Sequence, residues 1–117
     1  MADVVTLISD MLFSSKVREV AKQLGVTVQS TRDPAALAAA ARDAKLVIVD
    51  LRLEKALAAL ELLAGDPATK SIATVGFVDH ELTDVMDEAR ARGCQQVMAK
   101  GQFATALPKL LSALKPA

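Results

Sequence analysis

The chain has 117 residues, a length typical of one domain, and 52% of them are hydrophobic, which is enough to bury a core without disulfides or metal ions. Its 14 basic and 14 acidic residues give a formal net charge of zero, which argues against nucleic acid or an anionic membrane as the main partner. Cys94 is the only cysteine and His80 the only histidine, which excludes an internal disulfide and argues against a zinc site.

Short runs of β-branched or wholly apolar residues predict five strands. In chain order these are residues 4–8, 26–28, 46–49, 72–78 and, more weakly, 96–99. Runs of this length and composition suit strands that are covered on both faces.

Segments with apolar residues at helical spacing, or with high helix propensity, follow each of these runs. The predicted helices span residues 14–24, 34–44, 54–64, 81–92 and 102–114. Ser14 or Ser15 is expected to cap the first helix, and Asp33 the second, with Pro34 at its first position. Strands that alternate with helices in this way predict a parallel sheet with helices on both faces.

In such sheets the functional crevice lies at the carboxyl ends of the strands. At or directly after the ends of the first, third, fourth and fifth strands lie Ser9, Asp10, Asp50, Val78, Asp79, His80 and Lys100. Two carboxylates with main-chain oxygens suit a hard cation such as Mg²⁺. A carboxylate beside a metal and a lysine can act as a nucleophile toward a phosphoryl group.

Three segments carry a more specific resemblance. VTLISD, which ends at Asp10, LVIVDLRL around Asp50, and GCQQVMAKG around Lys100 resemble the first, third and fifth strands of response-regulator receiver domains. The resemblance covers nearly the whole chain. It implies a flavodoxin-like, doubly wound (βα)5 fold with a five-stranded parallel sheet in the order 2-1-3-4-5.

The resemblance also implies roles for individual residues. Asp50 would accept phosphate from a histidine kinase or a phosphotransfer protein. Asp10, Asp50 and the main-chain carbonyl of Arg52 would hold Mg²⁺, and Lys100 would pair with the phosphoryl group. As an alternative, Lys100 is an ion-pair partner of Asp50 in a vestigial site. Beyond its own phosphorylation and dephosphorylation, the chain is not expected to be an enzyme.

The sequence departs from the receiver pattern at the positions that usually complete the site and its switch. Receivers have an acid where Ser9 stands, a serine or threonine at Val78, and an aromatic residue at Val97. Valine cannot donate a hydrogen bond to phosphate, and Asp79 would repel phosphate unless it turns away. The resemblance thus implies either an atypical receiver in a phosphorelay or a pseudo-receiver that docks or dimerises without phosphate.

The last two helices have uneven charge. Residues 79–92 contain five acids against Arg90 and Arg92, whereas residues 93–117 contain Lys100, Lys109 and Lys115 and no acid. A downstream protein or a second copy of the chain is therefore expected to bind the face formed by the fourth and fifth helices, unless these are ordinary solvated surfaces.

The sequence also bears on location and extent. No basic segment precedes an apolar run at the N-terminus, and no apolar run reaches transmembrane length. A lone cysteine fits a reducing compartment. We expect residues 1–117 to form a single cytoplasmic domain that does not enter a membrane.

Overall fold

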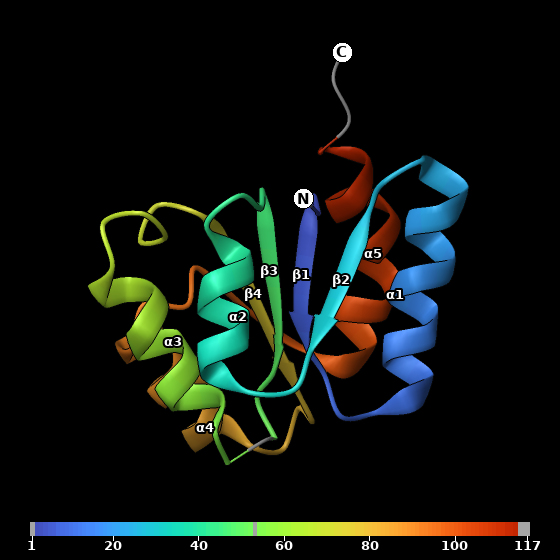
Figure 1. Cartoon of the computed structure of the whole chain (residues 1–117). Coiled ribbons are helices and arrows are strands. Elements are labelled where there is room, and N and C mark those ends of the chain that lie inside the picture. Colours follow the sequence, from blue (N-terminus) through green and yellow to red (C-terminus); the bar gives the residue numbers. More distant parts are fainter. Residues whose placement is uncertain (1, 53, 115–117) are drawn as a thin grey trace.

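Five parallel strands form one sheet in the computed structural model, which describes residues 2–52 and 54–114 (Figure 1). The strands are β1 (Val4–Leu7), β2 (Val28–Thr31), β3 (Leu46–Asp50), β4 (Ala73–Val78) and β5 (Gln96–Ala99). Their order across the sheet is β2-β1-β3-β4-β5. The predicted parallel sheet and its strand order are therefore confirmed.

The helices form a layer on each side of the sheet. One side carries α1 (Met11–Leu24) and α5 (Lys100–Ser112), which lie against each other (Figure 1). The other side carries α2 (Pro34–Ala41), α3 (Ala56–Gly65) and α4 (Thr83–Ala91). None of the helices in the described ranges is long and apolar enough to span a membrane.

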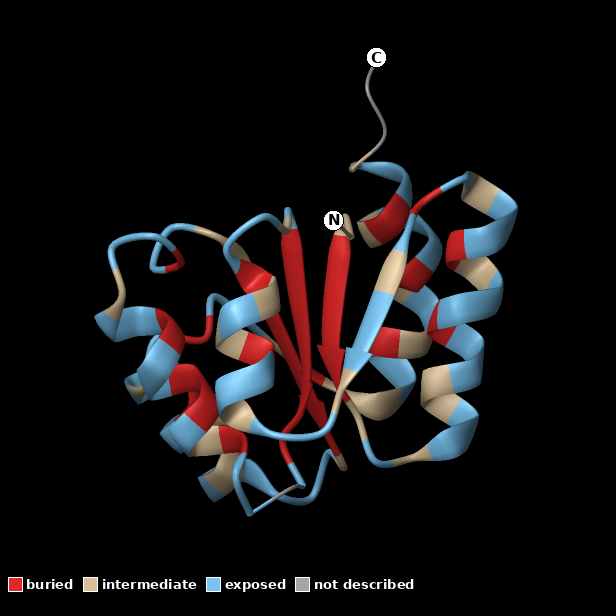
Figure 2. Ribbon diagram, in the orientation of Figure 1, coloured by how far each residue is buried: buried red, intermediate tan, exposed pale blue. Residues whose placement is uncertain are grey.

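The core consists of two hydrophobic clusters, one on each face of the sheet. The core divides in this way because alternate side chains of a strand point to opposite faces of the sheet, as those of β3 do. Val47 and Val49 pack under α2 and α3, whereas Leu46 and Ile48 pack under α1 and α5. Figure 2 shows β1 and β3 as buried throughout. The apolar runs at residues 4–8 and 46–49 thus contain strands that are covered on both faces, as predicted.

Several predicted boundaries differ from those in the structure, and two of the differences have a clear physical cause. Strand β2 lies at residues 28–31 rather than 26–28, since it is an edge strand with a polar, partly exposed sequence. Helix α1 begins at Met11, well before the predicted start, because Asp10 and not Ser14 or Ser15 caps it. The predicted cap at Asp33 is confirmed, since its side chain accepts a hydrogen bond from the Ala36 N–H.

Candidate functional site

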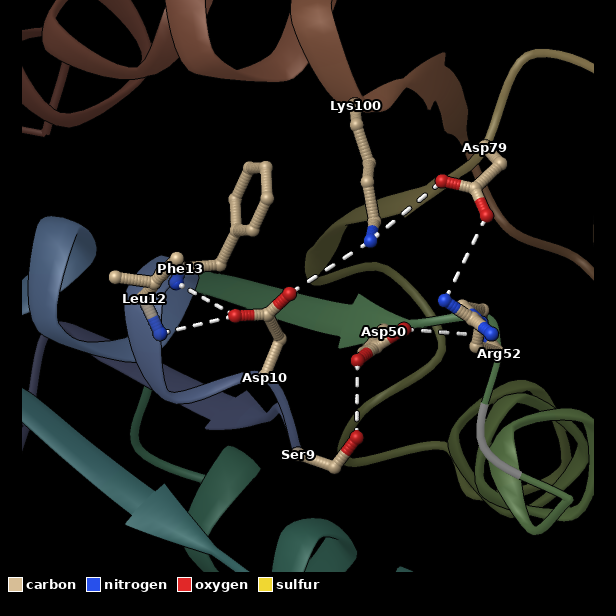
Figure 3. A network of polar contacts seen from close by, with 8 residues as sticks. All are labelled: Ser9, Asp10, Leu12, Phe13, Asp50, Arg52, Asp79 and Lys100. Atoms are coloured by element: carbon tan, nitrogen blue, oxygen red, sulfur yellow. Dashed lines mark hydrogen bonds and ion pairs between the residues drawn. The ribbon is translucent and has the colours of Figure 1, made fainter.

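The parallel strands bring polar side chains from four strand ends to one edge of the sheet (Figure 3). Ser9 and Asp10 follow β1, Asp50 ends β3, Asp79 follows β4, and Lys100 begins α5 directly after β5. The structure therefore gathers residues that lie up to 91 positions apart in the chain, from Ser9 to Lys100. Asp10, Asp50 and Lys100 lie together at this edge, where the sequence analysis expects them to meet.

The Asp50 carboxylate is buried, and each of its oxygens accepts one hydrogen bond. Asp50 is 2% exposed. Its Oδ1 accepts a hydrogen bond from the Arg52 N–H at 3.1 Å, and its Oδ2 accepts one from the Ser9 hydroxyl at 3.2 Å (Figure 3). These two bonds compensate for part of the cost of burying the carboxylate. Ser9 therefore contacts the predicted acceptor directly, although it brings no charge.

Asp10 makes a different contact through each of its carboxylate oxygens, and the sequence pattern did not distinguish the two. Its Oδ1 caps α1 by accepting hydrogen bonds from the N–H groups of Leu12 at 2.9 Å and Phe13 at 3.3 Å. Its Oδ2 lies 3.6 Å from the Lys100 Nζ. The carboxylate is thus held in place from both sides, by a helix terminus and by a cation.

The Lys100 ammonium lies between two carboxylates. Its Nζ is 3.6 Å from Asp10 Oδ2 and 3.5 Å from Asp79 Oδ1. It also lies over the ring of Phe13, 5.4 Å from the centroid, which favours a cation. Within the described ranges no ion pair joins Lys100 to Asp50. The alternative in which Lys100 is an ion-pair partner of Asp50 is therefore wrong for this structure, because the ammonium pairs with Asp10 and Asp79.

Asp79 is the site residue whose role the sequence did not reveal. It was expected only as a source of repulsion. In the structure its Oδ1 contacts Lys100, and its Oδ2 lies 3.6 Å from Arg52 Nη1 (Figure 3). One carboxylate thereby links the loop after β3 to the start of α5. Its position beside Val78, at a strand end, was the available signal, but a sequence does not show which cation such a carboxylate faces.

Val78 and Val97 are part of the hydrophobic core. Val78 is fully buried in the cluster under α2, α3 and α4, and the partly buried Val97 packs against the same cluster. Neither side chain can bind a phosphoryl oxygen. The positions at which receivers carry their switch residues are thus filled by apolar packing in this chain.

The donors available to a magnesium ion have suitable chemistry, but other groups compete for them. Carboxylate and carbonyl oxygens from Asp10, Asp50 and Arg52 are the ligands that Mg²⁺ prefers. Both carboxylates already accept hydrogen bonds or an ion pair from the protein. Across residues 2–52 and 54–114, no cluster of three or more histidine, cysteine or acidic side chains is arranged to hold a metal.

Comparisons of the fold identify similar solved structures, although no model of a protein family and no curated protein matches the sequence. A receiver domain from Rhodospirillum rubrum has 17% identity and a TM-score of 0.74, over 94% of this chain and 91% of that one. The receiver domain of a sensor histidine kinase from Pseudomonas aeruginosa, with magnesium in its active-site cleft, has 13% identity and a TM-score of 0.79, over 97% and 96%. A chemotaxis response regulator of Vibrio cholerae has 17% identity and a TM-score of 0.78, over 98% and 99%.

These structures establish the fold class. The chain has the α/β, flavodoxin-like fold of response-regulator receiver domains, with the strand order that this fold requires. The resemblance that was drawn from the three sequence segments is confirmed at the level of the fold. Fold alone does not define chemistry, which must be argued from the site.

Proposed function

We propose that the chain is an atypical receiver in two-component signalling, which accepts phosphate on Asp50 and passes the signal on through protein contacts. The observation that supports this most directly is the buried Asp50 at the end of β3, with Asp10 and Lys100 at neighbouring strand ends. A histidine kinase or a phosphotransfer protein would supply the phosphoryl group. The chemistry we propose is limited to the phosphorylation and dephosphorylation of Asp50, and it includes no reaction of another substrate.

The hydrogen bonds of Asp50 indicate which oxygen would react. Oδ1 is bound by the main-chain N–H of Arg52, which cannot turn away without moving the backbone. Oδ2 is bound by the Ser9 hydroxyl, which can rotate. We therefore propose that Oδ2 attacks phosphorus. The bond from phosphorus to the donor's imidazole nitrogen breaks, and that nitrogen keeps the electron pair.

The charge that builds on the phosphoryl oxygens needs cations close by. Lys100 would supply one after its ammonium leaves Asp79. When bound, Mg²⁺ would supply further positive charge, held by Asp10, Asp50 and the main-chain carbonyl of Arg52. Since Ser9 provides no second acid and Lys100 already pairs with Asp10, we expect magnesium binding to be weak.

Phosphorylation by a small donor tests this proposal. The wild type, Asp50→Asn and Asp43→Asn are incubated with acetyl phosphate and Mg²⁺, and their intact masses are measured. Asp43 is exposed and lies in the turn before β3, at the opposite end of that strand from Asp50, so its variant controls for the loss of one aspartate. We expect one added phosphoryl group in the wild type and in Asp43→Asn, and none in Asp50→Asn. A folded wild type that gains no mass refutes phosphate acceptance.

The second candidate function is phosphorylation-independent docking. It is favoured by the buried Val78, and by the ion pair between Lys100 and Asp79. A partner or a second copy would bind the face of α4 and α5, which flank the edge strand β5. Lys115, part of the predicted basic half of this face, lies outside the described residues.

The two candidates differ in what Asp50 contributes to binding. Docking without phosphate predicts that Asp50→Asn leaves self-association or partner affinity unchanged, as measured by light scattering or titration calorimetry. The receiver function predicts that acetyl phosphate changes that affinity in the wild type and has no effect on Asp50→Asn.

A further inference from the structure

A cavity of about 470 Å³ lies at the carboxyl ends of β1 and β2, between α1, the loop that leads into α2, and the segment before α3. Its lining contains neither Asp10 nor Asp50 nor Lys100. We propose that this cavity is a second site, which binds a small ligand that carries phosphate groups. The inference does not rest on phosphate acceptance at Asp50.

Basic side chains from three separate elements line the cavity. Arg18 comes from α1, Arg32 follows β2, and Lys55 precedes α3. Among the described residues none of the three pairs with a carboxylate, in contrast to Lys45, whose ammonium lies 3.7 Å from a carboxylate oxygen. In a chain with zero net charge this is a local excess of positive charge.

Among the described residues, the acids beside these segments form no ion pair with the three cations. Asp33 follows Arg32, but its carboxylate accepts a hydrogen bond from the main-chain N–H at the start of α2. Asp10 is bound at the start of α1 and by Lys100. No acidic side chain lines the cavity. The Lys55 ammonium donates to the main-chain oxygen of Arg32, which holds two of the basic segments together.

The remaining lining suits phosphate oxygens and a less polar group beside them. Ser14, Ser15 and Ser30 line the cavity, and within the described ranges their hydroxyls have no hydrogen-bond partner in the protein. Guanidinium groups recognise phosphate through paired hydrogen bonds, and hydroxyls can add to them. Met11 is 80% exposed at the rim, and with Ile8 it offers an apolar surface to the rest of a ligand.

The size of the cavity favours a small molecule over a bare ion. Its volume falls within the range of about 300–1,000 Å³ that is usual for small-molecule sites. A phosphate alone would leave most of this space empty. A phosphorylated compound with an apolar or planar body, of the size of a nucleotide, would use both the basic and the apolar lining.

Ser9 connects the cavity to the Asp50 site. It lines the cavity, and its hydroxyl donates to Asp50 Oδ2 at 3.2 Å. A ligand oxygen that accepts a hydrogen bond from Ser9 would draw this hydroxyl away from Asp50. Occupancy of the cavity would then change the hydrogen bonding of the predicted acceptor without contact between the ligand and the carboxylate.

Amide chemical shifts test the proposal with two probes, inorganic pyrophosphate and ADP. Isotope-labelled protein is titrated with each in the presence of a chelator, so that no metal supports binding at Asp50. We expect saturable shifts in residues 14–18, 30–32 and around Lys55. The double variant Arg18→Gln/Arg32→Gln should bind at least about tenfold more weakly, because it loses two charged hydrogen-bond donors.

Two controls keep the result specific. Lys16→Gln removes one exposed charge from the same helix outside the cavity and should leave binding unchanged. Asp50→Asn should also bind both probes, which separates this site from phosphate acceptance. Titrations without saturable shifts overturn the proposal. So does equal weakening by Lys16→Gln, or a set of shifts centred on Asp50 and Lys100.

Discussion

The Asp79 carboxylate holds Lys100 away from Asp50, so we expect its neutralisation to favour phosphorylation. Asp79 contacts Lys100 at 3.5 Å and Arg52 at 3.6 Å. The substitution Asp79→Asn keeps the shape of the side chain and removes its charge. The ammonium would then keep Asp10 as its one carboxylate partner, and an incoming phosphoryl group would meet one negative charge fewer.

The size of the effect follows from the geometry. Two unit charges about 4 Å apart interact by about 1 kcal/mol in water and about 4 kcal/mol at the effective dielectric constant of a protein surface. Asp79 is 43% exposed in its side chain, and Lys100 is 23% exposed. Pairs that are this accessible contribute about 0.2–1 kcal/mol. We therefore expect a coupling of up to about 1 kcal/mol, which corresponds to about a fivefold change in an equilibrium.

A double-mutant cycle measures this coupling without any phosphate. Urea unfolding of the wild type, Asp79→Asn, Lys100→Gln and the double variant should yield a favourable interaction of about 0.5–1 kcal/mol. The initial rate of phosphorylation by acetyl phosphate should then rise by up to about fivefold in Asp79→Asn. Glu81→Gln is the control, since Glu81 is an exposed acid nearby that contacts His80 and not Lys100.

Two results would refute this reasoning. A coupling close to zero would mean that the ion pair does not restrain Lys100. An equal gain in rate for Glu81→Gln would mean that overall charge, and not the contact, limits the approach of the phosphodonor. The cycle measures free energies of unfolding, so it tests the ion pair whether or not Asp50 accepts phosphate.

Three further predictions concern the scaffold. Asp33→Ala removes the hydrogen bond to the Ala36 N–H that caps α2, and should lower the free energy of unfolding in urea by about 1 kcal/mol. Gly76→Ala places a Cβ 2.9 Å from the side chain of Leu51, and it should cost about 1–3 kcal/mol in the same assay and less than that in a Leu51→Ala background, where the clash is absent. Burial raises the pKa of the Cys94 thiol, so iodoacetamide should label it far more slowly in the native protein than in urea; equal rates would contradict its burial.

The fold was predictable because its signals are local and agree with one another. Apolar runs such as residues 46–49 can be strands covered on both faces, and the segments between them are amphipathic or rich in alanine. The exception is β2, where an edge strand with polar side chains has no apolar run to mark it. The start of α1 was misplaced because the pattern does not show that Asp10 turns one oxygen toward the helix terminus.

The site was predictable in position but not in its contacts. The parallel sheet requires Asp10, Asp50 and Lys100 to meet at one edge, since they follow strand ends. Which carboxylate faces the ammonium depends on side-chain rotamers, and these are set by packing between segments far apart in the chain. The link through Asp79 to Arg52 therefore emerged from the structure alone.

The stacked phenylalanines beside the site have a practical consequence for spectroscopy. Phe13, Phe77 and Phe103 are the only aromatic residues of a chain without tryptophan or tyrosine, and the Phe77 ring lies 5.0 Å from that of Phe13 and 4.5 Å from that of Phe103. The protein is thus almost silent in near-ultraviolet absorbance and in fluorescence. A single Phe13→Trp substitution would place an indole beside the Lys100 ammonium, whose emission would report the position of that ammonium against a dark background.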